Sequence, residues 1–335
     1  MPLVVVTGGC GFIGCNLVRL LLREGGPDLR VRVFDALTYA GDLRNLADVI
    51  GDERLEVIQG DVADPAAISA ALCGADQVYH LAAESHNDRA ILDPWTTWRA
   101  NADGAARLLI AARDAGVGRL LFVSTDEVYG VAAEGQRFSE DAPLNPRGPY
   151  QASKAAGDCL ARAFFETYGL GVIIARPTNN YGPYQFPEKL IPVLVWRALH
   201  DEPLPLYGDG RQRRDFLHVE DCCRALVLLM DKGVPGQAYN IPGGNEHANI
   251  EVARAVLQLL GKPETLIRFV ADRPGHDFRY ALDGRKLAAL GWRPLIPWQQ
   301  GLRDTVAWYV ENRDWLEYML AKARDFLDRW YANRS

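Results

Sequence analysis

The chain has 335 residues, of which 48% are hydrophobic and 24% are charged. This composition is typical of a soluble globular protein of about two domains, and it excludes a disordered or fibrous chain. A net charge of −6 argues against a nucleic-acid-binding surface, and no apolar run reaches the ~18 residues of a membrane span. We therefore expect neither a nucleic-acid nor a membrane partner.

In the first half of the chain, short β-rich runs alternate with segments of helical period, which is typical of a parallel sheet covered on both faces. The patterns predict strands at 3–6, 31–35, 55–59, 77–81, 119–125 and 172–175, and helices at 12–24, 65–72, 101–115 and 150–168. Four prolines between 177 and 192 then interrupt regular structure and suggest a crossover into a smaller second lobe. Further on we predict a helix at 219–230, a strand at 238–241 that returns to the sheet, and a helical packing surface from 298 onward.

The six cysteines lack the paired spacing of a metal site, and the adjacent Cys222 and Cys223 have a poor geometry for a disulfide. Disulfides are rare in reducing compartments. We therefore expect a reduced, cytoplasmic protein without a bound metal.

A glycine-rich turn joins the first predicted strand to the first predicted helix. It can be read as Gly9-x-Gly11-x-x-Gly14 or as Gly8-x-x-Gly11-x-x-Gly14. Glycines let the backbone approach a pyrophosphate, and the N-terminus of the helix offers free N–H groups. A tight turn without any ligand is the alternative interpretation.

An acidic residue strengthens the ligand-binding interpretation. Asp35 ends the next predicted strand, 21 residues after Gly14, where a carboxylate accepts hydrogen bonds from a ribose and repels a 2′-phosphate. Asp61 and Val62 follow the third strand and are placed to contact an adenine. The pattern predicts an α/β fold with a Rossmann-type doubly wound parallel sheet, and NAD as the cofactor.

Two further motifs indicate chemistry. Tyr150 and Lys154 are four residues apart and share one face of a predicted helix. A nearby ammonium and a positive nicotinamide ring both favour the phenolate form of a tyrosine. Asp126 and Glu127, in Ser-Thr-Asp-Glu after a predicted central strand, add two carboxylates at the sheet edge where ligands bind. A pair of helix-capping acids is the alternative for these two residues.

Together these motifs resemble the extended short-chain dehydrogenase/reductase superfamily. Within it, the stretches 80–86 (HLAAESH), 179–184 (NNYGPY), 186–192 (FPEKLIP) and 272–277 (DRPGHD) resemble the dTDP-glucose 4,6-dehydratases. The resemblance implies a lyase of deoxysugar biosynthesis that converts a nucleoside-diphosphate glucose to its 4-keto-6-deoxy form by NAD-mediated internal hydride transfer. A UDP-sugar dehydratase, an epimerase or decarboxylase of the same superfamily, and a non-catalytic NAD-sensing protein are the alternatives.

The resemblance also implies roles for individual residues. Tyr150 would be the base at the sugar 4-hydroxyl, with Thr125 near O4 and Lys154 on the cofactor ribose. Glu127 would remove the C5 proton, and Asp126 would protonate the departing 6-hydroxyl; these tasks require environments that split the two pKa values. The residues implied to bind the cofactor are Gly8, Gly11, Phe12, Ile13, Gly14, Asp35, Asp61, Val62, Ala82, Tyr150 and Lys154. Those implied to bind the substrate are Ser85, Asn180, Lys189, Arg214, Asn245, Arg273 and His276.

The implied architecture has two lobes. Residues 1–178, with 215–241 returning, would form the NAD-binding domain, and 179–214 with 242–335 a smaller C-terminal α/β lobe for the nucleotide sugar. A homodimer would form through helices 101–115 and 150–168. Several positions depart from the usual family pattern, which puts the exact sugar in question more than the reaction: Cys10, Cys15, Asn87, Ala90, Pro177, Thr178 and Pro242.

Overall fold

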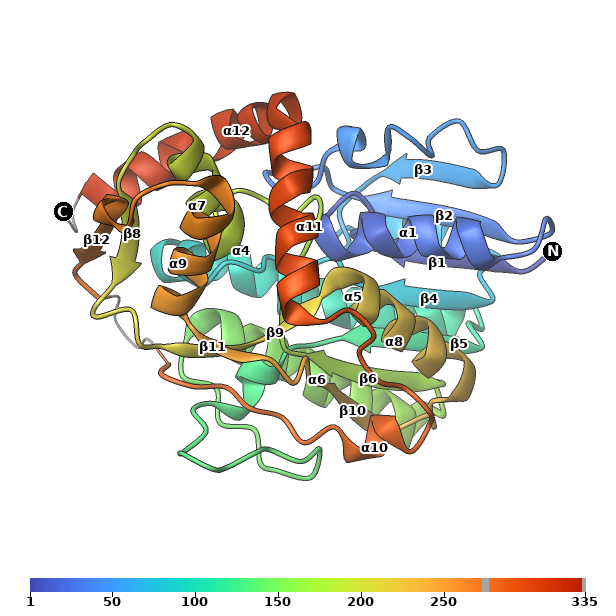
Figure 1. Ribbon diagram of the computed structural model, residues 1–335. Coiled ribbons are helices and arrows are strands. Elements are labelled where there is room, and N and C mark those ends of the chain that lie inside the picture. The colour runs from blue at the N-terminus through green and yellow to red at the C-terminus, as the bar shows by residue number, and fades with distance from the viewer. Residues whose placement is uncertain (273–276, 333–335) are drawn as a thin grey trace.

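A seven-stranded sheet forms the centre of the protein in the computed structural model, which describes residues 1–272 and 277–332 (Figure 1). The strand order is β10-β6-β5-β4-β1-β2-β3, and every neighbouring pair is parallel. The strands are β1 (Leu3–Thr7), β2 (Arg30–Asp35), β3 (Leu55–Gln59), β4 (Gln77–His80), β5 (Arg119–Val123), β6 (Val172–Pro177) and β10 (Ala238–Ile241). The predicted doubly wound parallel sheet is confirmed, including the return of the strand at 238–241.

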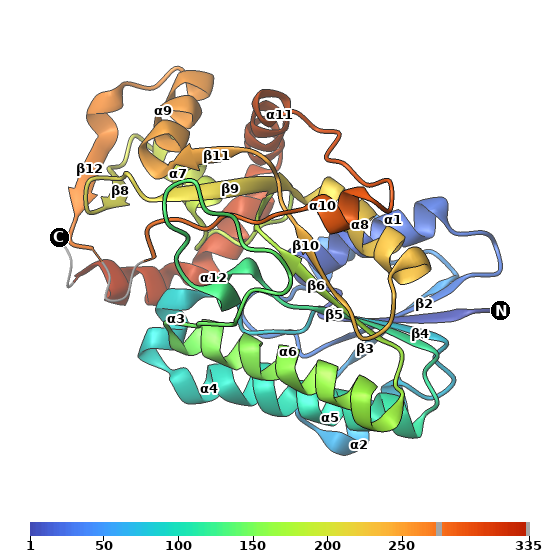
Figure 2. The ribbon, with the colours of Figure 1, turned by 90° about the horizontal axis from the view of Figure 1, so that it is seen from below.

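Helices cover both faces of this sheet (Figure 2). On one face lie α1 (Phe12–Glu24) and α8 (Val219–Lys232); on the other lie α2 (Pro65–Ala71), α5 (Gly104–Asp114) and α6 (Pro149–Tyr168). Alternation along β1 shows why two layers form: Val4 and Val6 pack into the core beneath α1 and α8, whereas Val5 packs into the core beneath α5.

The helix predicted at 101–115 begins earlier than the prediction. Helical backbone runs from α4 (Pro94–Trp98) through a π-helical turn, η2 (Arg99–Asp103), into α5. Asp93 caps this stretch by accepting a hydrogen bond from the backbone N–H of Thr96, and Pro94 occupies the first turn. Trp95 and Trp98 are exposed, so the large apolar residues of this first part do not mark a buried helix face, and the sequence pattern did not predict a helix there.

A second lobe follows β6. It contains a three-stranded sheet of β11 (Glu246–Ala248), β9 (Arg213–His218) and β7 (Asn179–Tyr181), and a parallel pair, β8 (Leu204–Tyr207) and β12 (Ile267–Val270). Strand β9, within the segment expected to return to the large sheet, pairs instead with β7 and β11. The larger helices of this lobe, α7 (Leu190–Leu199), α9 (Asn249–Leu260) and α11 (Trp298–Glu311), pack around a core of their own.

The short elements complete the fold: η1 (Leu43–Leu46), α3 (Asn87–Leu92), η3 (Asp126–Tyr129), η4 (Glu264–Leu266) and α10 (Arg285–Ala288). The final helix, α12 (Arg313–Ala332), packs Met319, Phe326 and Trp330 against Phe186 and Tyr39. This confirms the packing surface predicted beyond residue 298. None of the helices in the described part of the chain is long and apolar enough to cross a membrane.

The chain changes direction across the sheet at β1. It first builds β2 and β3 on one side and then crosses to β4 on the other. The loops after β1 and β4 therefore leave the carboxyl edge in opposite directions, and such a switch point is where open α/β sheets bind ligands.

Candidate active site

A cavity of about 280 Å³ lies at this carboxyl edge. It is lined by loops that follow the strands of the large sheet and by residues 185–189 of the second lobe. All the residues that the sequence predicted to bind the cofactor line it: Gly8, Gly11, Phe12, Ile13, Gly14, Asp35, Asp61, Val62, Ala82, Tyr150 and Lys154.

Gly8 and Gly14 of the glycine loop have no room for a side chain, so the backbone there stays open to a pyrophosphate. Gly8 has a φ of +71°, and a Cβ there would lie 2.6 Å from the backbone nitrogen of Ala82. A Cβ on Gly14 would lie 2.1 Å from the carbonyl oxygen of Gly8. The bare loop at the start of α1 is therefore a cradle into which a phosphate can approach the free N–H groups of the helix. These residues fit NAD.

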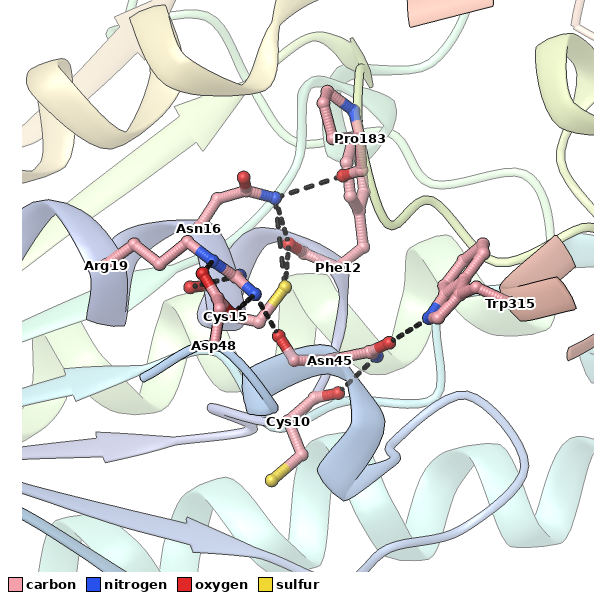
Figure 3. Close-up of polar contacts among 9 residues, drawn as sticks. All are labelled: Cys10, Phe12, Cys15, Asn16, Arg19, Asn45, Asp48, Pro183 and Trp315. Carbon is pink, nitrogen blue, oxygen red and sulfur yellow. Dashed lines mark hydrogen bonds and ion pairs between the residues drawn. The ribbon is translucent and has the colours of Figure 1, made fainter. Parts of the chain in front are cut away.

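Polar contacts behind the loop hold it in shape (Figure 3). The Nδ2 of Asn45 donates to the carbonyl oxygen of Cys10 at 2.7 Å, and the Nε1 of Trp315 donates to the Oδ1 of Asn45 at 2.8 Å. On α1, the Nδ2 of Asn16 donates to the carbonyl oxygen of Pro183 at 3.1 Å. The loop is thus connected to the second lobe by side chains that the motif does not contain.

Asp35 ends β2 at the wall of the cavity and is buried. Its carboxylate accepts hydrogen bonds from the backbone N–H groups of Cys10, at 2.9 Å, and Leu37, at 2.8 Å. Burial raises the pKa of Asp35, while these two N–H groups lower it. A carboxylate has about four lone-pair sites, so it can still accept hydrogen bonds from a ribose.

Tyr150 and Lys154 reach the same cavity from the first turns of α6. The Nζ of Lys154 donates to the carbonyl oxygen of Val123 at 2.7 Å, and burial lowers the pKa of Lys154 to about 8. Burial, followed by the charge of Glu127, raises the pKa of Tyr150 above its ordinary value, and the Thr125 hydroxyl opposes this. The phenolate therefore needs a positive charge beyond those of the protein, which a nicotinamide ring supplies.

The two carboxylates follow β5 in the short helix η3, which Thr125 caps by accepting a hydrogen bond from the backbone N–H of Glu127 at 3.3 Å. Both are buried, and they lie beside Tyr150 rather than in the cavity wall itself. Burial, followed by the charge of Glu127, raises the pKa of Asp126 to about 7, and the hydroxyl of Thr178 lowers it by donating to Oδ2 at 2.8 Å. Asp126 therefore keeps its proton to near-neutral pH.

Comparisons with known proteins agree with this geometry. The model of the NAD-dependent epimerase/dehydratase family matches residues 4–242. The chain belongs to this family. It is 44% identical to a dTDP-glucose 4,6-dehydratase of Streptomyces niveus, over 94% of each chain, and 46% identical to one of Neisseria meningitidis serogroup B, over 96% of each. Among solved structures, the chain resembles DesIV, the dTDP-glucose 4,6-dehydratase of Streptomyces venezuelae, which was crystallised with NAD bound. The two sequences are 48% identical, and the structures superpose with a TM-score of 0.92 over 95% of this chain and 99% of DesIV.

The resemblance stated from the motifs is therefore confirmed. Membership of the epimerase/dehydratase family also agrees with NAD, the cofactor that the glycine loop and Asp35 predicted. No group of three or more His, Cys, Asp or Glu side chains within residues 1–272 and 277–332 is placed to hold a metal ion.

The predicted substrate-binding residues of this family member fall into two groups. Ser85 and Lys189 line the cavity, where the Nζ of Lys189 donates to the carbonyl oxygen of Ser85 at 2.5 Å. Three more lie on or beside the three-stranded sheet, and their side chains bond to the backbone: Asn180 to Thr178, Asn245 to Gly243, and Arg214 to Asp277. Arg273 and His276 lie outside the described residues.

Sequence reasoning did not assign a role to several residues that meet at Glu127. Its Oε2 accepts hydrogen bonds from Asn87 at 2.9 Å, from Gln151 at 3.0 Å and from Tyr280 at 3.2 Å. Asn87 was noticed only as a departure from the family pattern. Gln151 stands within the Tyr-x-x-x-Lys motif as an unspecified residue, so no local signal distinguished it.

Proposed function

We propose that the protein is a hydro-lyase that converts dTDP-glucose to dTDP-4-keto-6-deoxyglucose, with NAD bound throughout. The observation that carries this proposal is the pair Asp126 and Glu127 beside Tyr150, with the pKa of Asp126 raised to about 7. A reaction that only oxidises and reduces C4 needs a tyrosine but not a protonated acid next to a carboxylate. The substrates named for the relatives support the same reaction.

The cofactor would be held by the glycine loop at its pyrophosphate, by Asp35 at the adenosine ribose, by Asp61 and Val62 at the adenine, and by Lys154 at the second ribose. When bound, NAD supplies a hydride acceptor at C4 of the sugar and a hydride donor at C6, so that none is consumed. Tyr150 takes the proton of the 4-hydroxyl as C4 becomes a ketone, and Thr125 hydrogen-bonds near O4.

The 4-ketone makes the neighbouring C5 hydrogen acidic. Glu127 removes this proton, and Asp126 gives its own proton to the 6-hydroxyl, which leaves as water. One carboxyl must therefore be ionised while its neighbour is protonated, and the burial of Asp126 supports that division. As hydride adds to C6, C5 takes a proton back from Glu127, whose proton has exchanged with solvent. Tyr150 then gives up the proton of the 4-hydroxyl and Asp126 regains one, through solvent, so that all three groups return to their starting protonation states.

We propose that the second lobe binds the nucleoside diphosphate. Lys189 and Arg214 would supply the cations and Asn180 and Asn245 the amides, while Ser85 would add a hydroxyl from the first domain; guanidinium groups suit paired phosphate contacts. Arg273 and His276 remain predictions from the sequence. In this division, residues 1–178 with α8 and β10 hold the cofactor, and the rest of the chain holds the sugar nucleotide.

The function is tested by incubating the purified protein with dTDP-glucose and no added cofactor, and detecting the 4-keto-6-deoxy product by mass spectrometry. We expect product, and its absence from a folded protein that contains NAD would refute the proposal. Competition between dTDP-glucose and UDP-glucose identifies the nucleotide. The variant Glu127→Gln should oxidise C4 and accumulate reduced nicotinamide without losing water, whereas a 4-epimerase would keep its full activity.

We also propose a cytoplasmic homodimer. Four large apolar side chains of α4, α5 and α6 are exposed, and their exposure supports contact with a second copy: Trp95, Trp98, Ile110 and Tyr168. All six cysteines are free, which supports a reducing compartment. Light scattering after gel filtration should give twice the monomer mass, and Trp98→Glu should give monomer.

A further inference from the structure

Two side-chain amides from separate helices converge on one oxygen of Glu127. The Nδ2 of Asn87, the first residue of α3, donates to Oε2 at 2.9 Å, and the Nε2 of Gln151, in the first turn of α6, donates to the same atom at 3.0 Å. In the part of the chain that the structure describes, every hydrogen bond to the side chain of Glu127 ends on Oε2. The other oxygen, Oε1, receives none from residues 1–272 and 277–332.

The third group at this oxygen is the hydroxyl of Tyr280, at 3.2 Å. The same hydroxyl lies 2.6 Å from the Oδ2 of Asp277. A phenol has one proton to donate, and the shorter contact to a carboxylate holds it. The amides of Asn87 and Gln151 are therefore the donors on which Oε2 depends.

The two ends of the Gln151 amide face different neighbours. Its Oε1 lies toward Gly148, where an added Cβ would be only 2.4 Å away. The NH₂ end faces Glu127, because only this end of an amide can donate a hydrogen bond to a carboxylate. Gln151 is 5% exposed, so solvent does not offer the amide an alternative partner.

Asn87 is held in place by its neighbours on α3. The Nε of Arg89 donates to the Oε2 of Glu188 at 2.7 Å, and the hydroxyl of Tyr207 donates to the Oδ2 of Asp88 at 2.9 Å. Glu188 and Tyr207 both belong to the second lobe. The start of α3 is therefore held by contacts with the second lobe, and from this position the side chain of Asn87 reaches Glu127.

We propose that Asn87 and Gln151 are positioning residues that hold Oε2 of Glu127 and leave Oε1 as the atom that takes the proton from C5 of the sugar. This inference rests on the proposed function. The terminal torsion of a glutamate is broad and roughly two-fold, so one fixed oxygen sets the direction of the other.

The variants Asn87→Leu and Gln151→Met test the inference because they remove the donors and keep the approximate shape. In deuterated water, the rates of deuterium entry at C5 and of product formation should fall about tenfold in each single variant and about 100-fold in the double variant, as expected for a misplaced catalytic group. The formation of reduced nicotinamide on mixing with dTDP-glucose, and the KM, should stay within about twofold.

A second route to the same defect is Gly148→Ala. The backbone there is extended, with φ −138° and ψ 168°, so alanine is tolerated and the amide of Gln151 must move instead. It should reproduce the Gln151→Met result. The matched control is Asn312→Leu, which removes an amide that bonds to the backbone of Trp308 at the end of α11 and should leave both rates unchanged.

Three outcomes decide the matter. If the oxidation of C4 and the exchange at C5 fall in the same proportion, the amides have only a structural role and the inference is wrong. If the double variant keeps its C5 exchange within twofold, the inference is also wrong, while the proposed function stands. If the unaltered protein forms no keto sugar, the proposed function itself fails and the inference falls with it.

Discussion

Asp126 provides a test of the site's electrostatics through its replacement by asparagine. The pKa of this carboxyl is raised from 3.8 to about 7, chiefly by burial and then by the charge of Glu127. A raised pKa in the folded state means that folding opposes ionisation. The stability of the protein should therefore be unaffected below pH ~4, fall as the pH rises from about 4 to 7, and stay lowered above that.

The size of the effect follows from the shift. About three pKa units at 1.36 kcal/mol each correspond to about 4 kcal/mol above pH 7. Because part of the shift is shared with Glu127, we expect Asp126→Asn to recover at least about 2 kcal/mol at pH 8 and almost nothing at pH 4. Asparagine retains an acceptor for the Thr178 hydroxyl, so the local hydrogen bond survives.

The measurement is urea-induced unfolding of both proteins, saturated with NAD, at several pH values between 4 and 8.5. The exposed Asp231→Asn serves as a control for the loss of a charge far from the site. A variant that is no more stable than the unaltered protein at pH 8, or a difference that does not change with pH, would show that Asp126 is not held in its protonated form by burial.

Two further perturbations test the cofactor loop and the support of α6. Gly14→Ala places a Cβ 2.1 Å from the Gly8 oxygen. An overpacking cost of about 1–3 kcal/mol should weaken NAD binding, measured by calorimetry, by about 10–100-fold. The control is Gly26→Ala, whose Cβ meets open space and should leave NAD binding unchanged. Arg176→Met leaves Asp158 buried without its partner at 2.8 Å and should cost about 3–5 kcal/mol in urea unfolding.

Each of these has a clear contrary result. Undiminished NAD binding by Gly14→Ala would mean that the loop can rearrange around a side chain. Replacing Asp158 by leucine together with Arg176→Met should restore much of the lost stability, since no charge is then left unpaired. If the double variant is as unstable as the single one, packing rather than charge accounts for the loss.

The parts of the fold that were predictable from sequence are those with a local signal. Helix 12–24 was predicted at its observed bounds, because a strand and a glycine turn precede it and Gly25 follows it. The stretch 94–100 was not predicted as helix, because its tryptophans point outward and a π-helical turn breaks the helical period. Strand β9 was assigned with the returning segment, since nothing in its sequence indicates which of two sheets it joins.

The site divides in the same way. The cofactor residues were predictable because strand ends in a parallel sheet share one edge, so that motifs far apart in sequence meet in the cavity. The polar groups around Glu127 come from positions 87, 151 and 280, on elements whose mutual placement depends on the packing of the two lobes. Spacing along the chain contains no information about such a convergence.

The last helix joins two parts of the chain that are far apart in sequence. From the middle of α12, Lys322 forms an ion pair with Asp42 at 3.0 Å, in the loop beyond β2, and near its end the Nε1 of Trp330 donates to the hydroxyl of Tyr207, in β8, at 2.6 Å. One helix thus contacts both the loop after β2, of which Gly41 lines the cavity, and the second lobe. A movement of the second lobe relative to that loop would have to break contacts of α12.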